Sequence, residues 1–301
     1  MPQVLTLVAN RTATSLTDAV IAHVCEAAGG GTPAVLSAGE AVDILLPAAP
    51  DMEAVRAALQ GAAIDAIPVP AGLRRRRLLI ADMDSTIVTG ETLDELADFA
   101  GLKDRIAAIT RRSMNGEIDF AEALRERVAM LRGLRLEALE QTWQRVRLTP
   151  GAAELVATMR ANGAVTALVS GGFTFFTGRV AELVGFEVHR SNVLLHDGTA
   201  LSGTVAEPIL DRDAKLQTLL SLAAERGVPL SDTLAIGDGA NDLAMLRAAG
   251  LGVAFRAKPI VAAEARARVD HGTLRSVLFA QGYRAEEIIG GSGDYAPRSR
   301  D

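Results

Sequence analysis

The sequence predicts an α/β protein in which a mainly parallel sheet carries helices on both faces and follows a small α+β domain. Three observations predict this class. Short aliphatic segments alternate with helical segments from about residue 78 onward. A long helical interval separates the first two of these aliphatic segments. Residues 1–70, which precede them, show a different alternation of strand-like and helical segments.

The N-terminal region, residues 1–72, is expected to form the small domain. Its predicted elements are a strand at VLTLVA, a helix over Leu16–Ala28 capped by Ser15, strands at PAVLS and VDILLP, a helix over Asp51–Leu59 and a strand over Ile64–Val69. This order, strand-helix-strand-strand-helix-strand, is that of the split ferredoxin-like unit. No cluster of catalytic residue types appears within it.

A run of four arginines, Arg74–Arg77, follows the segment Pro68–Pro70. Such a run could contact nucleic acid or anionic lipid. Because the whole chain is acidic, with a formal net charge of −6, we interpret it instead as a solvated linker.

Residues 73–290 are expected to form the α/β domain. Its candidate strands are Leu78–Ala81, Val165–Val169, Thr233–Ile236 and Leu251–Ala254. The interval from about Leu93 to Val146 is too long for a simple crossover, so it is predicted to be a helical cap inserted at about residues 89–149. Residues 291–301, rich in Gly, Ser and charge, are expected to be a flexible tail.

Composition excludes several classes of protein. The acidic charge argues against a general nucleic-acid binder, which needs a basic face. No apolar run approaches the roughly 18 residues of a membrane span. The start of the sequence lacks the basic flank and apolar block of a secretion signal. A single cysteine, Cys25, excludes an internal disulfide framework and suits a cytoplasmic location.

Acidic residues follow two of the predicted strands. Asp82 and Asp84 come directly after one, and Asp238 and Asp242 follow another. Ligands of open α/β sheets collect at the carboxyl ends of the strands, so these carboxylates should meet. Like charges at short range resist joint ionisation unless a cation neutralises them, and oxygen ligands without His or Cys favour Mg²⁺. Either pair alone could serve helix capping or a turn, but both pairs at equivalent places favour a site.

Two further features suit a phosphate site. In VSGGFT, Ser170 ends a strand, and Gly171 and Gly172 let backbone amides approach an anion. Lys215 supplies a positive charge within a helical pattern. Each feature alone is weak, because Ser-Gly-Gly turns are common and single lysines are usually solvated.

Taken in order, these motifs resemble those of the haloacid dehalogenase (HAD) superfamily, whose Rossmannoid sheet carries an inserted cap. The motifs are Asp82-x-Asp84-x-Thr86, Ser170, Lys215 and GDGAND at residues 237–242. DMDSTIVTGETLDELA, DFAEALRERVAMLRGL, the SN pair at 191–192 and GVAFRAKP look like segments of its phosphoserine phosphatase branch. There are small departures: Arg256 stands where histidine is often seen, and Ser202-Gly203 where Thr-Gly is usual. The N-terminal domain resembles ACT-like regulatory domains only in its element order.

The resemblance implies a mechanism. Asp82 would be the nucleophile that forms an aspartyl-phosphate, and Asp84 the general acid and base. Mg²⁺ would be held by Asp82, the backbone carbonyl of Asp84 and Asp238, with Asp242 in support. Ser170, the amide of Gly171, and Lys215 would offset the charge of the phosphoryl group.

The resemblance also implies how substrate is bound. Glu91 would pair with the ammonium group of O-phospho-L-serine and Arg127 with its carboxylate. Met114 and Phe120 would form an apolar wall, and Gly172 and Asn241 would complete the site. The alternatives are that Glu91 caps a helix, that Arg127 pairs with a neighbouring acid, and that Met114 and Phe120 are ordinary core residues.

The function predicted first is Mg²⁺-dependent hydrolysis of O-phospho-L-serine to L-serine and phosphate, the last step of L-serine biosynthesis, by a possible homodimer. A phosphotransferase to an alcohol acceptor such as homoserine would share every catalytic residue, and another small phosphate ester could be the substrate. The alternative outside enzymes is an amino-acid-sensing regulatory protein. The intact set of catalytic residue types argues against that reading.

Overall fold

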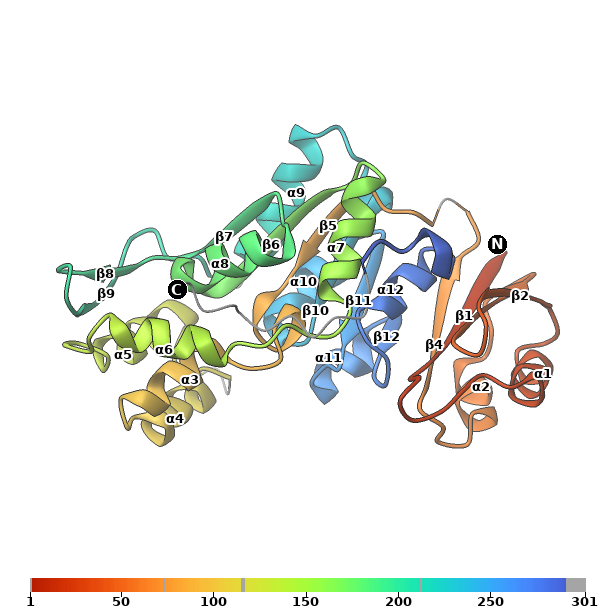
Figure 1. Ribbon diagram of the computed structural model, residues 1–301, viewed down its shortest axis with the longest axis horizontal. Helices are drawn as coiled ribbons and strands as arrows, with labels where there is room; N and C mark the ends of the chain where they lie inside the picture. The colour runs from red at the N-terminus through yellow and green to blue at the C-terminus, as the bar shows by residue number, and fades with distance from the viewer. Residues whose placement is uncertain (1, 73, 115–116, 212, 291–301) are drawn as a thin grey trace.

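The computed structural model describes residues 2–72, 74–114, 117–211 and 213–290. Figure 1 shows an elongated molecule with the N-terminal α+β domain at one end, the parallel sheet in the middle and the helical cap at the other end. The tail predicted at residues 291–301 lies outside the described part. Among the described helices, none is both long and apolar enough to cross a lipid bilayer.

The N-terminal domain has the predicted element order. Its elements are β1 (Gln3–Ala9), α1 (Asp18–Ala27), β2 (Thr32–Ser37), β3 (Ala41–Leu46), α2 (Met52–Ala58) and β4 (Ile64–Pro70). The strands form one antiparallel sheet in the order β2-β3-β1-β4. The expected cap was wrong: α1 begins after Thr17, whose hydroxyl accepts from the amide of Val20, whereas the Ser15 hydroxyl donates to the carbonyl of Gly39.

The central sheet is parallel, with strand order β12-β11-β10-β5-β6-β7. Its strands are β5 (Leu78–Ala81), β6 (Val165–Phe173), β7 (Val188–Asn192), β10 (Thr233–Gly237), β11 (Leu251–Phe255) and β12 (Ala267–Val269). The four predicted strands are confirmed, whereas β7 and β12 were not predicted. These two lie at the edges, where short or polar strands such as VHRSN lack the continuous hydrophobic run of a strand buried on both faces.

Helices cover both faces of this sheet (Figure 1). They are α7 (Ala152–Ala161), α8 (Thr174–Val184), α9 (Ala214–Glu225), α10 (Leu243–Ala248), α11 (Pro259–Glu264) and α12 (Arg275–Ala280). The side chains of β5 alternate between the two cores. Leu79 and Ala81 pack with α7, α8 and α12, and Leu78 and Ile80 pack with α9, α10 and α11. All four are fully buried, as expected for the centre of a doubly covered sheet.

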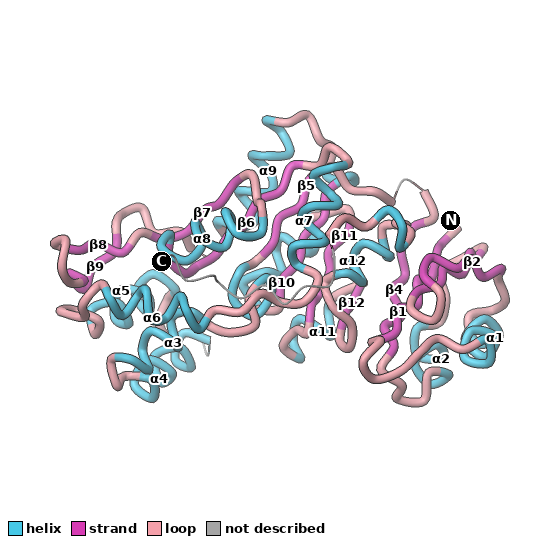
Figure 2. The backbone as a smooth tube through the Cα atoms, viewed as in Figure 1, coloured by secondary structure: helices cyan, strands magenta, loops and turns pink. Residues whose placement is uncertain are grey.

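The inserted segment between β5 and α7 is helical, as Figure 2 shows in cyan. It comprises α3 (Thr92–Phe99), α4 (Lys103–Met114), α5 (Phe120–Ala129) and α6 (Glu137–Arg145). The chain enters and leaves it through two paired segments: Val88 and Leu148 form an antiparallel bridge, and the amide of Thr89 donates to the carbonyl of Arg147 at 3.0 Å. A hairpin that was not predicted, β8 (Leu194–His196) and β9 (Leu201–Val205), lies beside α5.

The arginine run is not a solvated linker. Only 7% of Arg76 is exposed, and its amide donates to the side-chain oxygen of Gln281 at 3.0 Å. Arg74 forms an ion pair with Asp43 of β3 at 2.7 Å. The run therefore fastens the N-terminal domain to the α/β domain through partners far away in the sequence.

A buried carboxylate forms a second link between these domains. Asp65 on β4 is 4% exposed, and it accepts the amide hydrogens of Asp270, His271 and Gly272 at 2.8, 3.0 and 2.8 Å. Burial raises the pKa of Asp65, although the three amide donors act in the opposite direction. This carboxylate fixes β4 against the loop that follows β12.

We expect Asp65→Ala to lower the free energy of unfolding by about 3 kcal/mol, because three amide donors lose a buried acceptor. A urea titration followed by circular dichroism would measure the loss. The control is Asp18→Ala, which removes an exposed first-turn carboxylate of α1 and should cost less than about 1 kcal/mol. Equal losses for the two variants would contradict the role given to Asp65.

Candidate active site

Two neighbouring strands bring the first carboxylates together. Asp82 directly follows β5, and Asp238 directly follows β10, which pairs with β5 in parallel. The amide of Asp82 donates to the carbonyl of Ile236 at 3.0 Å and extends this pairing to the sheet edge. Both carboxylates therefore lie at the carboxyl edge of the sheet, where ligands of α/β folds bind.

A buried ammonium group links two of these acids. The Nζ atom of Lys215 lies 2.7 Å from Asp82 Oδ1 and 2.6 Å from Asp242 Oδ1, and only 3% of the lysine is exposed. The second oxygen of Asp242 accepts the amide of Gly239 at 2.9 Å. A side chain at Gly237 would overlap Asp242, so glycine is required where β10 ends.

The electrostatics of this cluster favour a further cation. One oxygen from each of Asp82, Asp238 and Asp242 lies within 4.8 Å of the others. Burial raises the pKa of Asp82 well above its ordinary value, although Lys215 opposes the shift, and burial raises the pKa of Asp238 to about 6. Burial alone would lower the pKa of Lys215, but Asp242 and Asp82 raise it instead. Three buried carboxylates around one ammonium group suit a hard divalent cation.

The Asp84 carboxylate faces a different set of partners. Its oxygens accept the amide of Thr92 at 2.7 Å and the hydroxyl of Ser170 at 3.2 Å, so it lies outside the cluster of three. Burial, followed by the negative charge of Glu91, raises the pKa of Asp84 to about 6. Such a carboxyl can hold a proton near neutral pH, as a general acid must.

The predicted phosphate loop, residues 170–172, falls in the last part of β6 and lies beside this second carboxylate. The hydroxyl of Ser170 accepts the amide of Gly172 at 2.9 Å. The ring of Phe120 packs directly on Gly171, since a Cβ added there would lie 3.0 Å from the ring. Phe120 begins α5, so this contact closes the cap over the carboxyl edge of the sheet. Met114 ends α4, and its side chain lies outside the described part of the structure.

The predicted ammonium partner makes a local contact. Glu91 accepts the hydroxyl of Ser85 at 2.8 Å, and Ser85 has a left-handed backbone conformation with φ 57°. Glu91 occupies the N-cap position of α3 but makes no capping hydrogen bond. The alternative that it caps this helix is therefore not supported.

The predicted carboxylate partner has no acidic neighbour within ion-pair distance in the described chain. Arg127 donates to the carbonyl of Ala123 at 3.1 Å and to the hydroxyl of Thr110 at 3.5 Å, both neutral oxygens. Burial lowers the pKa of Arg127. Arg125, two positions earlier, instead forms an exposed ion pair with Glu207 at 2.7 Å. Arg125 thus has an acidic partner, whereas Arg127 has none among the described residues. An arginine that binds an anionic ligand needs a guanidinium without an acidic partner.

Two residues of this region were missed as site residues. Asn192 is 1% exposed, and its amide group donates to the carbonyl of Gly171 at 3.0 Å and accepts from the amide of Leu210 at 2.8 Å. It therefore ties the phosphate loop to the segment before α9. The ammonium group of Lys258 lies 3.8 Å from Asp238. Asn192 lies in the SN segment and Lys258 in the AKP segment, but neither sequence pattern indicates that these side chains contact Gly171 or Asp238.

The predicted site residue Asn241 is exposed in the turn between β10 and α10. Its side chain makes no hydrogen bond to another described residue. The structure brings it to the same sheet edge as Asp238, with its Oδ1 atom lying against Gly239.

A sequence profile described as haloacid dehalogenase-like hydrolase matches residues 79–247, which include both acidic strand ends, Ser170 and Lys215. The chain belongs to this family. The matched region begins within β5 and ends within α10, so it contains the cap as well as the centre of the sheet.

Relatives within the family share much of the chain. A phosphoserine phosphatase of Streptomyces coelicolor is 44% identical over 227 residues, which cover 75% of this chain and 55% of that protein. A phosphoserine phosphatase of Albidiferax ferrireducens is 43% identical over 224 residues, which cover 72% of this chain and 94% of that protein. The chain thus spans about half the length of the Streptomyces relative and nearly all of the Albidiferax one.

Solved structures of the family have the same fold. A HAD family hydrolase of Salmonella enterica serovar Typhi has a TM-score of 0.82 at 29% identity, covering 92% of this chain and 98% of its own. A structure described as the phospho-aspartyl intermediate analogue of phosphoserine phosphatase has a TM-score of 0.63 at 38% identity, covering 68% of this chain and 98% of its own. The first comparison includes the N-terminal domain as well as the family's own α/β domain.

We expect Mg²⁺ to raise the unfolding temperature most above about pH 7 and progressively less as the pH falls through about 6, because protons then compete for Asp238. Without metal, the contribution of Asp238 to stability depends on pH in the opposite direction. The folded protein holds this proton more tightly than the unfolded chain, so the Asp238 contribution to stability falls as pH rises from its ordinary pKa toward about 6.

Thermal unfolding in EDTA and in Mg²⁺, at pH 5 to 8, would measure both effects. Asp238→Asn should remove most of the Mg²⁺-dependent rise, whereas the exposed control Asp18→Asn should keep it. A rise that is independent of pH and of Asp238 would contradict the cation site.

Proposed function

We propose that this protein is a phosphoserine phosphatase, which hydrolyses O-phospho-L-serine to L-serine and phosphate. The observation that carries the proposal is the pair Arg127 and Glu91. Arg127 has no acid within ion-pair distance among the described residues, and the charges of Asp94 and Glu91 oppose the lowering of its pKa by burial. A substrate with a carboxylate and an ammonium group beside its phosphate matches such a pair. The phosphoserine phosphatases among the relatives support the same substrate.

In the first half-reaction, an Asp82 oxygen attacks phosphorus while the bond from phosphorus to the serine oxygen breaks. Asp84 donates its proton to the departing serine oxygen, and an aspartyl-phosphate remains. The position of Asp82 at the sheet edge and the raised pKa of Asp84 support these roles. The phospho-aspartyl analogue described for a structural relative supports the intermediate.

In the second half-reaction, Asp84, now ionised, takes a proton from water as the water oxygen attacks phosphorus. The bond from phosphorus to Asp82 breaks, and phosphate leaves with Asp82 restored. Ser170, the amide of Gly171, and Lys215 stabilise the charge of the phosphoryl oxygens in both steps. The hydrogen bonds of Ser170 to Asp84 and of Gly172 to Ser170 support a preformed phosphate loop.

Magnesium is the proposed cofactor. Asp82, the backbone carbonyl of Asp84 and Asp238 would hold it, with Asp242 in support, and the clustered carboxylate oxygens support this donor set. When bound, it would neutralise these carboxylates and part of the phosphoryl charge.

Phe120 and Met114 are proposed as the apolar wall of the substrate site, with Gly172 and Asn241 lining the phosphate end. The contact of Phe120 with Gly171 supports the role of Phe120 in the apolar wall.

Participation in L-serine biosynthesis, a cytoplasmic location and a homodimer stay predictions, and so do the domain limits 1–72 and 73–290. Product analysis with and without an alcohol acceptor would separate hydrolysis from transfer to homoserine.

We expect Asp82→Asn to abolish phosphate release, because an amide oxygen is a poor nucleophile. Phosphate release from O-phospho-L-serine with Mg²⁺ present measures the loss, and circular dichroism checks the fold. Asp104→Asn is a matched control that changes an exposed carboxylate in the first turn of the cap helix α4, and it should retain turnover. Substantial turnover by Asp82→Asn, after deamidation has been excluded by mass spectrometry, would contradict the assignment.

We expect Arg127→Ala to lower kcat/KM for O-phospho-L-serine by roughly 30-fold or more, since losing a desolvated charged hydrogen bond costs about 2–5 kcal/mol and about 1.4 kcal/mol is tenfold. Hydrolysis of p-nitrophenyl phosphate, which has neither an ammonium nor a carboxylate, should change far less. Arg125→Ala is the matched control, because its guanidinium is already paired with Glu207 at the surface. Equal losses on both substrates would mean that Arg127 serves the fold or the phosphate instead of the carboxylate.

A further inference from the structure

The strand that carries the phosphate loop does not pair evenly with its neighbour. β6 and β7 pair in parallel as far as Val169↔Arg190, and the pairing resumes at Phe173↔Asn192. Three residues of β6, 170–172, therefore lie against a single residue of β7. Such a bulge leaves backbone groups of the longer strand without partners in the ladder. Because these three residues form the phosphate loop, its backbone needs partners from elsewhere.

The side chain of Asn192 supplies one of these partners. Its Nδ2 atom donates to the carbonyl of Gly171 at 3.0 Å. The amide of Gly172, which belongs to the same peptide group as this carbonyl, donates to Ser170 Oγ at 2.9 Å. Both ends of the peptide group are thus held. Because a peptide group is planar, these two hydrogen bonds fix its orientation within the loop.

The same side chain holds the segment that leads into α9. Asn192 Oδ1 accepts the amide of Leu210 at 2.8 Å, and Nδ2 also donates to the carbonyl of Leu210 at 3.3 Å. Since an oxygen must face the Leu210 amide, the nitrogen must face the carbonyl of Gly171. One side-chain amide therefore connects two segments that are distant in the sequence.

The second of these segments continues into the buried lysine. The carboxylate of Asp211, the residue after Leu210, accepts the amide of Ala214, the first residue of α9, at 3.2 Å. Lys215 follows in α9, and its Nζ atom lies 2.7 Å from Asp82 Oδ1. Hydrogen bonds thus join Leu210 to the helical turn from which the ammonium group extends.

Phosphate binding at this edge requires the loop and the lysine to keep a fixed separation. The groups proposed to meet the phosphoryl oxygens are Ser170 Oγ and the amide of Gly171 on β6, and Lys215 Nζ on α9. Such groups bind one anion together only if each is held to within about 0.5 Å. Asn192 is 1% exposed, and within the described chain its side-chain hydrogen bonds go to Gly171 and Leu210. It therefore lies where it can set this separation.

We propose that Asn192 is a positioning residue for the phosphoryl group. It fixes the Gly171 end of the phosphate loop relative to Lys215, so that donors from both segments meet the same anion. It acts through the loop and not by contact with the substrate. The proposal rests on the proposed phosphatase chemistry, but it applies to any phosphate ester, since the hydrogen bonds of Asn192 in the described chain include neither Glu91 nor Arg127.

Asn192→Leu tests this, because it keeps the approximate size of the side chain and removes its donor and acceptor. We expect the Kd for inorganic phosphate, measured by isothermal titration calorimetry with Mg²⁺ present, to rise at least about tenfold. The value of kcat/KM should fall by a similar factor for O-phospho-L-serine and for p-nitrophenyl phosphate, because both carry the same phosphoryl group. Asn192→Ser, which keeps a hydroxyl, is a milder variant and should change all three values in the same direction even if Asn192→Leu does not fold.

The matched control is Gln281→Leu. Gln281 is also 1% exposed, and its side-chain amide likewise joins two backbone groups: it accepts the amide of Arg76 at 3.0 Å and donates to the carbonyl of Val277 at 3.2 Å. Because this link lies at the junction with the N-terminal domain, its loss should lower the unfolding temperature, as the loss of Asn192 should. It should leave the affinity for phosphate unchanged.

Two results would overturn the role of Asn192: an unchanged Kd in its variants, or equal rises of Kd in Asn192→Leu and Gln281→Leu. A loss of kcat/KM confined to O-phospho-L-serine would overturn it as well. Absence of phosphate binding by the unaltered protein would instead overturn the phosphatase function on which the proposal rests. Turnover of p-nitrophenyl phosphate without turnover of O-phospho-L-serine would overturn only the serine assignment, and the test of Asn192 would still hold.

Discussion

The site depends on one buried charge arrangement, the Lys215 ammonium between Asp82 and Asp242. Removing either partner of such a buried pair typically costs about 3–5 kcal/mol, because the remaining charge is left uncompensated. The lysine therefore allows two acids to stay close together inside the protein. It also holds the Oδ1 atom of Asp82 in place at the carboxyl edge of the sheet. The fully buried strands β5 and β10 supply the rigid support that this arrangement requires.

The two carboxylates proposed as catalytic lie in different surroundings. Asp82 faces the lysine and the other cluster acids, whereas Asp84, two residues later, faces the amide of Thr92 and the hydroxyl of Ser170. Asp82 therefore has a cationic neighbour for its charge, whereas Asp84 has neutral donors and the negative charge of Glu91, and the proposed roles of nucleophile and general acid call for such different surroundings.

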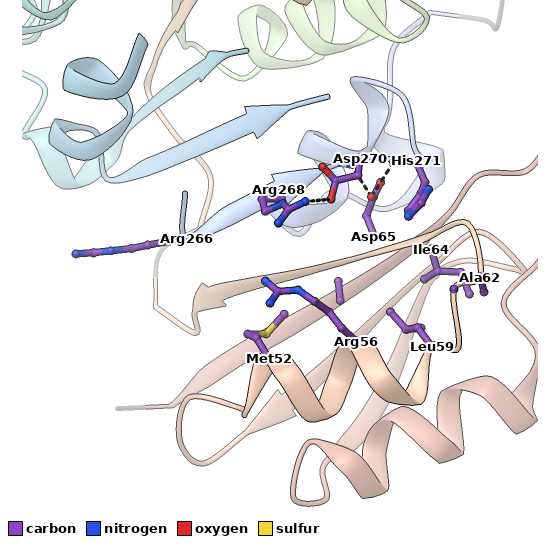
Figure 3. Close-up of a pocket in the computed structure, with 12 residues that line it drawn as sticks. Met52, Arg56, Leu59, Ala62, Ile64, Asp65, Arg266, Arg268, Asp270 and His271 are labelled. Carbon is purple, nitrogen blue, oxygen red and sulfur yellow. Dashed lines mark hydrogen bonds and ion pairs between the residues drawn. The ribbon is translucent and has the colours of Figure 1, made fainter. Parts of the chain in front are cut away.

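The junction between the two domains is held by long-range polar contacts over a shared apolar core. Val4 and Ile67 of the N-terminal domain belong to the same buried cluster as Val277 of α12. Arg275 adds an ion pair to Glu40 at 3.0 Å and a second to Glu154 at 3.1 Å. With Asp65 and the arginine run, these contacts make the N-terminal domain a packed neighbour of the α/β domain. Figure 3 shows a pocket at this junction, lined by Arg56 of α2 and Arg268 of β12 among others.

The sequence alone determined the strands of the sheet centre, the helical cap and the acidic strand ends, because these depend on local hydrophobic periodicity and on residues adjacent in the chain. Only the tertiary structure decided the edge strands, the contacts of the arginine run and the two carboxylate partners of Lys215. Arg76 and Gln281, for example, are joined across 205 positions of the sequence. No local pattern records such a pairing, since it forms only when packing of the apolar core brings distant segments together.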